Sequence, residues 1–153
     1  MRDDDAFGFL LVTATRLMRA RFEQALGEAR LDLTPAEART LVAAQRRGPV
    51  RQAELALALG IEPMTLVNHL DRLESRSMVR REAAPLDRRS KQVIVTTTAK
   101  PAIRRIRRVL DQATASALAS FSAQERSQFA DFLERLCHAL HPDMARSAVD
   151  TPD

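Results

Sequence analysis

The chain has 153 residues, the length of one domain with its own buried core. Hydrophobic residues make up 45% of it and charged residues 29%, and with no Trp, no Tyr and only four Gly the composition favours helices over a β-sandwich or barrel. One Cys excludes an internal disulfide and fits a reducing compartment. The acidic start MRDDDAFGF differs from a signal peptide, and no apolar run reaches the roughly 20 residues that span a bilayer, so we expect a cytoplasmic protein without a membrane segment.

The net charge of +4 hides a basic middle segment. Residues 1–71 carry nine Lys and Arg against ten Asp and Glu, residues 72–108 carry twelve against three, and residues 109–153 carry three against seven. Such an excess in the middle is typical of a surface that binds a polyanion. Solvated helix faces produce the same run, so its position in the fold has to decide between the two interpretations.

The first two predicted elements are helices. Apolar residues recur every three or four positions over Asp3–Leu31, which predicts one long amphipathic helix. A second helix is predicted to about Arg46, because Thr34, Pro35 and Glu37 form the pattern of an N-cap, a first-turn proline and a capping box.

Two short helices joined by a tight turn follow. The first is predicted over Arg51–Leu59 and ends at Gly60, which suits a left-handed terminator. The second begins at Pro63 and runs to about Arg76. A pair of this kind, with the second helix amphipathic, is typical of a helix-turn-helix.

The second helix of this pair has an apolar and a polar face. The expected inner face holds Leu66, Val67, Leu70 and Leu73. The opposite face holds Thr65, Asn68, His69 and Arg72. In the major groove Asn pairs with adenine, Arg pairs with guanine and Thr contacts either base edges or phosphate. An ordinary exposed helix face has the same composition, so the interpretation depends on the segment that follows.

Two β-rich runs, Met78–Glu82 and Gln92–Thr96, come next and are joined by the nine residues Ala83–Lys91. They predict a hairpin with a long loop, a wing. Arg suits a narrow minor groove, where the negative potential is strongest. Asp87 is expected to orient a neighbouring guanidinium. The predicted cationic tip holds Asp87, Arg88, Arg89 and Lys91.

Helical periodicity then returns up to the tail. One long helix is predicted from near Thr97 or Thr98 to about Ser120, because Pro101 is tolerated only in a first turn. A capping box at Ser122–Glu125 opens a last helix that ends before Pro142. The apolar stripes of the first and last two helices exceed what a small helix-turn-helix core covers, so we expect a twofold homodimer. A dimer of this kind sets two recognition helices about 34 Å apart, one turn of DNA.

The motifs LTPAEARTL, ELALALGIEPMTLVNHLDRLE and DRRSKQVIVT, in this order, resemble the MarR family of winged-helix regulators, and most nearly its SlyA-like members, over residues from about 7 to 140. The resemblance implies a mainly α fold with a small β-wing. It divides the single domain 1–153 into a DNA-binding lobe at about 33–97 and dimerisation helices at about 5–31 and 98–141.

The resemblance also implies a homodimer on a palindromic operator of double-stranded DNA, with a recognition helix in the major groove and a wing in the minor groove. Family members often sense aromatic or phenolic acids in a pocket between the lobe and the dimerisation helices. No effector-binding residue is predicted in this chain. The residues and the resemblance together assign DNA contact to Pro63, Thr65, Asn68, His69, Arg72, Asp87, Arg88, Arg89 and Lys91.

Three segments depart from the family pattern. Asn68 stands where SlyA-like members often carry Arg, which indicates a different base preference. Ser77 replaces the Gly that usually follows the recognition helix, at a cost in free energy if its φ is positive. Thr96–Ala99 replaces the sequence T-E-K-G or T-E-K-A, which leaves open which Thr caps the long helix.

Other chemistry is sparse. Cys137, His138 and His141 form C-H-x-x-H, but zinc needs further ligands, and no metal site is predicted. Cys137 is expected to be a buried apolar side chain. We find no phosphate loop, no nucleophile elbow and no convincing paired carboxylates, so neither an enzyme nor a cofactor is predicted.

The sequence therefore predicts a sequence-specific DNA-binding regulator, a repressor released from a palindromic operator by a small aromatic or phenolic acid. Two alternatives stay open. One is a basic architectural dimer that coats DNA without a ligand, and the other is a regulator that senses oxidants through Cys137.

Overall fold

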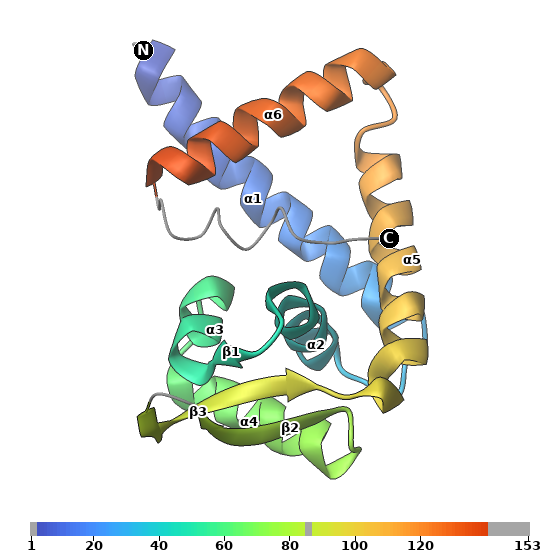
Figure 1. Ribbon diagram of the computed structural model, residues 1–153. Helices are drawn as coiled ribbons and strands as arrows, with labels where there is room; N and C mark the ends of the chain where they lie inside the picture. The colour runs from blue at the N-terminus through green and yellow to red at the C-terminus, as the bar shows by residue number, and fades with distance from the viewer. Residues whose placement is uncertain (1–2, 85–86, 141–153) are drawn as a thin grey trace.

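The computed structural model describes residues 3–84 and 87–140 of the chain. Helices α2, α3 and α4 and a small sheet form one lobe, while α1 and α5 pack against each other and α6 turns back from the far end of α5 (Figure 1). The elements in chain order are α1 Asp3–Glu28, α2 Pro35–Arg47, β1 Val50–Arg51, α3 Gln52–Leu59, α4 Pro63–Ser75, β2 Val79–Ala84, β3 Asp87–Val95, the 3-10 turn η1 Thr97–Ala99, α5 Lys100–Ala117 and α6 Ala123–Leu140. The prediction of a mainly helical winged helix-turn-helix is confirmed.

Local capping places α2 and α6 as the sequence predicted. Thr34 Oγ1 accepts a hydrogen bond from the Glu37 N–H, and Glu37 Oε2 accepts one from the Thr34 N–H at 2.9 Å. Ser122 and Glu125 make the same reciprocal pair in front of α6. Each box satisfies two N–H groups that a helix start otherwise leaves without partners.

The turn after α3 and the turn after α4 are built alike. Gly60, at φ 62° and ψ 42°, follows α3, and the N–H of Ile61 returns to the carbonyl of Ala56. After α4 the left-handed position is Ser77, at φ 56°, and the N–H of Met78 returns to the carbonyl of Leu73. Both are Schellman ends, which favour Gly because a Cβ is disfavoured at positive φ. The expected backbone cost at Ser77 is therefore present.

The sheet has three antiparallel strands in the order β1-β3-β2. The two-residue strand β1 pairs Val50 with Val93, and the sequence analysis missed it because two residues carry no periodicity. The prediction of a long loop in the wing was also wrong. Strand β3 begins at Asp87 and Lys91 pairs with Ala83, so most of the segment assigned to a loop is strand. Backbone hydrogen bonds between β2 and β3 make this segment a strand, and its polar composition gave no sign of that in the sequence.

The start of α5 settles the ambiguity among the threonines. A 3-10 turn over Thr97–Ala99 precedes the α-helix, and Pro101 lies in its first turn, where its missing N–H is harmless. No side-chain cap is formed at this start. Thr96 instead uses its hydroxyl to bond the carbonyl of Ser77 at 2.6 Å.

The core lies where the three lobe helices meet the sheet and the first half of α5. Burying each large aliphatic side chain there stabilises the fold by about 1.5–3 kcal/mol. Ile103 and Ile106 bring α5 into this core. The large side chains with relative exposure under 2% include Leu41, Leu55, Leu66, Leu70, Leu73, Val79, Val93 and Ile106.

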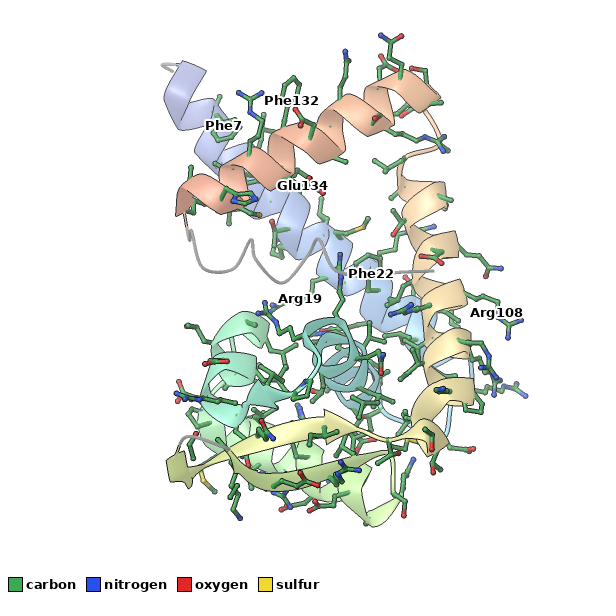
Figure 2. All side chains as sticks on the ribbon, in the orientation of Figure 1. Phe7, Arg19, Phe22, Arg108, Phe132 and Glu134 are labelled. Atoms are coloured by element: carbon green, nitrogen blue, oxygen red, sulfur yellow. The ribbon has the colours of Figure 1, made fainter. Side chains whose placement is uncertain are left out.

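The terminal helices are barely buried within one chain. Leu26 is the only fully buried side chain of α1 among those described, and α6 has none in its described length. Phe7 on α1 is 58% exposed and Phe132 on α6 is 59% exposed, and both lie outside the lobe (Figure 2). None of the helices in the described part of the chain has the length and hydropathy to cross a membrane.

Candidate nucleic-acid interface

Helix α4 presents its polar face to solvent, with its apolar side on the core. Leu66, Leu70 and Leu73 are buried, which makes this side the inner face. Thr65 and Asn68 are exposed on the opposite side, and Pro63 is exposed at the first turn. Three of the residues assigned to DNA contact therefore lie free on one outer surface.

His69 lies on the flank of this face, against α2. Its Nδ1 is 3.2 Å from the hydroxyl oxygen of the buried Thr40. Because that hydroxyl donates its proton to the carbonyl of Ala36 at 2.9 Å, Nδ1 of His69 is the donor of the pair. Burial lowers the pKa of His69 below its usual 6.5, and the positive charges of Arg39 and Arg72 add to the effect against the opposing pull of Glu37. The fold therefore favours the neutral form of the His69 imidazole.

Arg72 is tied to α2 as well. Its Nη1 lies 3.3 Å from Oε1 of Glu37, a carboxylate with a side-chain exposure of 2%. Burial by itself raises the pKa of Glu37, but the N–H of Thr34 and the guanidinium of Arg72 outweigh it and hold the pKa below its usual value. The Arg72 side chain is still 66% exposed, so it holds Glu37 from the solvent side.

Met64 is a residue of this surface that sequence reasoning missed. Its side chain is 69% exposed at the first turn of α4. It lies four residues before Asn68, so the two side chains are neighbours on one face. The signal was available in the sequence, since helical spacing puts position 64 beside position 68 rather than with Leu66.

A second missed feature joins α4 to strand β2. Arg81 binds Asp71 through Nη2 at 2.6 Å, and it binds Glu74 through both its side chain and its backbone N–H. The hydrogen bonds from Arg81 lower the pKa of Glu74. One positive charge thereby offsets part of the negative charge of two carboxylates, and the start of the hairpin is fixed to α4.

The outer end of the hairpin carries the remaining assigned residues. Ala84 pairs with Asp87 where continued register would require Ser90, so the β3 side bulges by three residues. The bulge places the backbone of Arg88 and Arg89 next to the tip. The side chains of Asp87, Arg88 and Arg89 lie outside the described residues, and so does their predicted pairing. Lys91 is exposed.

An open groove of about 440 Å³ lies between α1 and α5. Ala25, Val109 and Ala113 line it with apolar surface. At one end Arg21 reaches Oγ of Ser116 at 2.7 Å. The rest of the lining is largely polar, with the carboxylate of Glu28 and the amides of Gln24 and Gln112, so the groove combines an apolar wall with polar groups of both signs.

Cys137 is exposed in the single chain, contrary to the expected burial, because α6 buries no described residue against its own chain. In the described part of the chain no group of three or more metal-binding side chains gathers. His141 lies outside that part.

Known proteins share this architecture. The sequence model of the MarR family matches residues 33–91. The transcriptional regulator PA3341 is 30% identical, with a TM-score of 0.70, over 89% of this chain and 98% of its own. A MarR structure is 26% identical, with a TM-score of 0.73, over 95% of this chain and 98% of its own.

CouR from Rhodococcus jostii RHA1, solved with p-coumaroyl-CoA bound, shares the fold at 23% identity, with a TM-score of 0.67, over 85% of this chain and 90% of its own. The family is one of DNA-binding transcriptional regulators. These matches agree with the helix-turn-helix and the hairpin described above. The chain belongs to the MarR family of winged-helix transcriptional regulators.

Proposed function

We propose that this regulator is a repressor that binds a palindromic operator as a homodimer and is released by a small aromatic or phenolic acid. The exposed outer face of α4, locked to the base of a basic hairpin by Arg81, is the observation that carries the proposal. In this proposal α4 enters the major groove and the hairpin enters the minor groove. The contact residues are Pro63, Thr65, Asn68, His69, Arg72, Asp87, Arg88, Arg89 and Lys91.

The dimer in this proposal forms through the terminal helices, at about residues 5–31 and 98–141, with the lobe at about 33–97 left free for DNA. Large exposed apolar side chains on α1 and α6 support it, because burying such surface is the main force in association. Phe7→Glu with Phe132→Glu is expected to give monomers in sedimentation. Leu57→Glu is the matched control, since Leu57 is 70% exposed on α3.

The effector in this proposal lies in the groove between α1 and α5. A ring would pack on Ala25, Val109 and Ala113, and a carboxylate would bind Arg21. CouR, with its p-coumaroyl thioester, supports a phenolic acyl group as a candidate. Thermal shift with salicylate, p-coumarate and p-coumaroyl-CoA tests this, with Arg21→Gln as the variant that should lose the shift. If no compound shifts the wild type, the ligand part of the proposal is wrong.

Operator binding has its own test. Footprinting on the DNA upstream of the coding region should protect a short palindrome, and the dimer should prefer it to random duplex by about 10³-fold or more. Arg89→Ala should weaken binding and reduce the salt dependence. Equal affinity for random duplex would support the architectural alternative. Loss of binding on peroxide treatment that Cys137→Ser abolishes would support the redox alternative.

A further inference from the structure

The outer face of α4 is divided by its contacts with α2. His69 donates to Thr40, and Arg72 is held by the buried Glu37. Both side chains therefore lean toward α2, on the flank of the recognition face. Arg72 also belongs to the last turns of α4, whereas in a helix-turn-helix the N-terminal residues of the recognition helix reach the base edges.

The first turns of α4 carry three side chains free of such contacts. Met64, Thr65 and Asn68 are exposed, and no hydrogen bond or ion pair engages their side chains in the described part of the chain. Met64 and Asn68, four residues apart, lie next to each other. These three form the part of the recognition face that can enter the groove first.

Their chemistry selects particular bases. An Asn amide matches the N6 donor and N7 acceptor of adenine. The apolar side chain of Met64 suits the C5 methyl of thymine, which is the one apolar group on the major-groove edge. Neither residue offers the two parallel donors that guanine requires, and the Arg that could supply them is bound to Glu37.

We propose that the recognition helix of this protein reads A·T pairs at the centre of each half-site, with Asn68 on adenine and Met64 on the methyl group of a nearby thymine. The inference rests on the proposed function and specifies its DNA target. His69 and Arg72, on the flank toward α2, then contact phosphates rather than bases.

The test begins with selection of duplex sites from a random library by the full-length dimer. Each thymine of the selected site is then replaced singly by deoxyuridine, which removes only the C5 methyl. In each half-site, one of these single replacements should weaken wild-type binding about fourfold, which is the effect of losing one buried methyl-sized group. Met64→Ala should bind both DNAs equally, while Leu57→Ala, an equally exposed substitution on α3, should keep the wild-type discrimination.

Asn68 is tested in parallel. Replacing one adenine by 7-deazaadenine should cost the wild type about tenfold, and Asn68→Ala should be insensitive to the replacement. Circular dichroism and melting temperature verify that the variants fold, which the exposure of both side chains leads us to expect. Selected half-sites with guanine at the positions protected by α4, or a deoxyuridine effect that Met64→Ala retains, would overturn the assignment. A library with no enriched site would overturn the proposed function together with it.

Discussion

The hydroxyl of Thr96 donates a 2.6 Å hydrogen bond to the backbone carbonyl of Ser77. This contact joins the end of β3 to the turn that follows α4, and the N–H of Thr96 adds a bond to the carbonyl of Met78 at 3.0 Å. It fixes the joint between the recognition helix and the hairpin at Ser77, a residue with a Cβ that occupies a left-handed conformation typical of glycine, with φ 56°. The joint is thus rigid although its backbone is strained.

Ser77→Gly should therefore stabilise the protein. Removing the Cβ relieves about 1–2 kcal/mol of left-handed strain, and the greater freedom of glycine in the unfolded chain offsets part of it. We expect a net gain of about 0.5–1 kcal/mol in urea denaturation. Ser75→Gly is the control, because Ser75 is the last residue of α4 and keeps helical backbone, where glycine is less favourable and should not stabilise. If both variants lose stability, the strain at Ser77 is not real.

Glu37→Gln should destabilise the lobe at neutral pH. The amide keeps the shape of the capping box but loses the charge that binds Arg72, and hydrogen bonds to charged groups are worth about 1.5–3 kcal/mol. The pKa of Glu37 is lowered in the fold, so its contribution is complete above about 4.5 and is lost as pH falls through the folded value. The stability gap between wild type and variant should close at low pH. A gap that is constant from pH 7 to 3 would contradict the assignment.

His69 should make stability depend on pH near neutrality. Its pKa is lowered in the fold, so the unfolded chain takes up the proton first and wild-type stability falls as pH drops below 6.5 toward the folded value. His69→Gln should lack this decline, and the His69 C–H resonances should titrate below the usual midpoint. Denaturation at pH 8 and 5 measures the first effect, and NMR titration measures the second. If the stability of wild type and of His69→Gln depends on pH in the same way, the predicted contribution of His69 is wrong.

Arg81→Met should weaken both the fold and operator binding. The substitution leaves Asp71 and Glu74 without their shared cation, at about 2 kcal/mol, and makes the surface next to α4 more negative by one charge. Arg80→Met is the matched control on the same strand, because Arg80 is 58% exposed and pairs only with Glu82 in the described part of the chain. We expect the control to lie within about 0.5 kcal/mol of wild type. Equal losses of stability and of operator binding in the two variants would mean that the loss of a positive charge causes the effect. The contacts of Arg81 with Asp71 and Glu74, which we call the Arg81 clamp, would then not be responsible.

The sequence by itself determined the order of the helices and the ends that local capping marks, while the start of α5 had to come from the structure. Thr34 with Glu37, Gly60 and Ser122 with Glu125 act through neighbours in the chain, so their capping could be read without a fold. Periodicity likewise identified the inner face of α4, and the motif order identified the family. The expectation of strain at Ser77 was also local, since φ is a property of one residue.

Only the tertiary structure decided what depends on contacts between distant segments. The strand β1, the early start of β3 and the Arg81 clamp arise from backbone and ion pairs that no local pattern encodes. The same holds for His69 and Arg72, which the helical period placed on an open face of α4. In the fold, Thr40 of α2 contacts His69 and Glu37 of α2 binds Arg72, so both side chains lie on the flank of that face. A helix face is set by its own period, but which of its side chains are free is set by the neighbour that packs beside it.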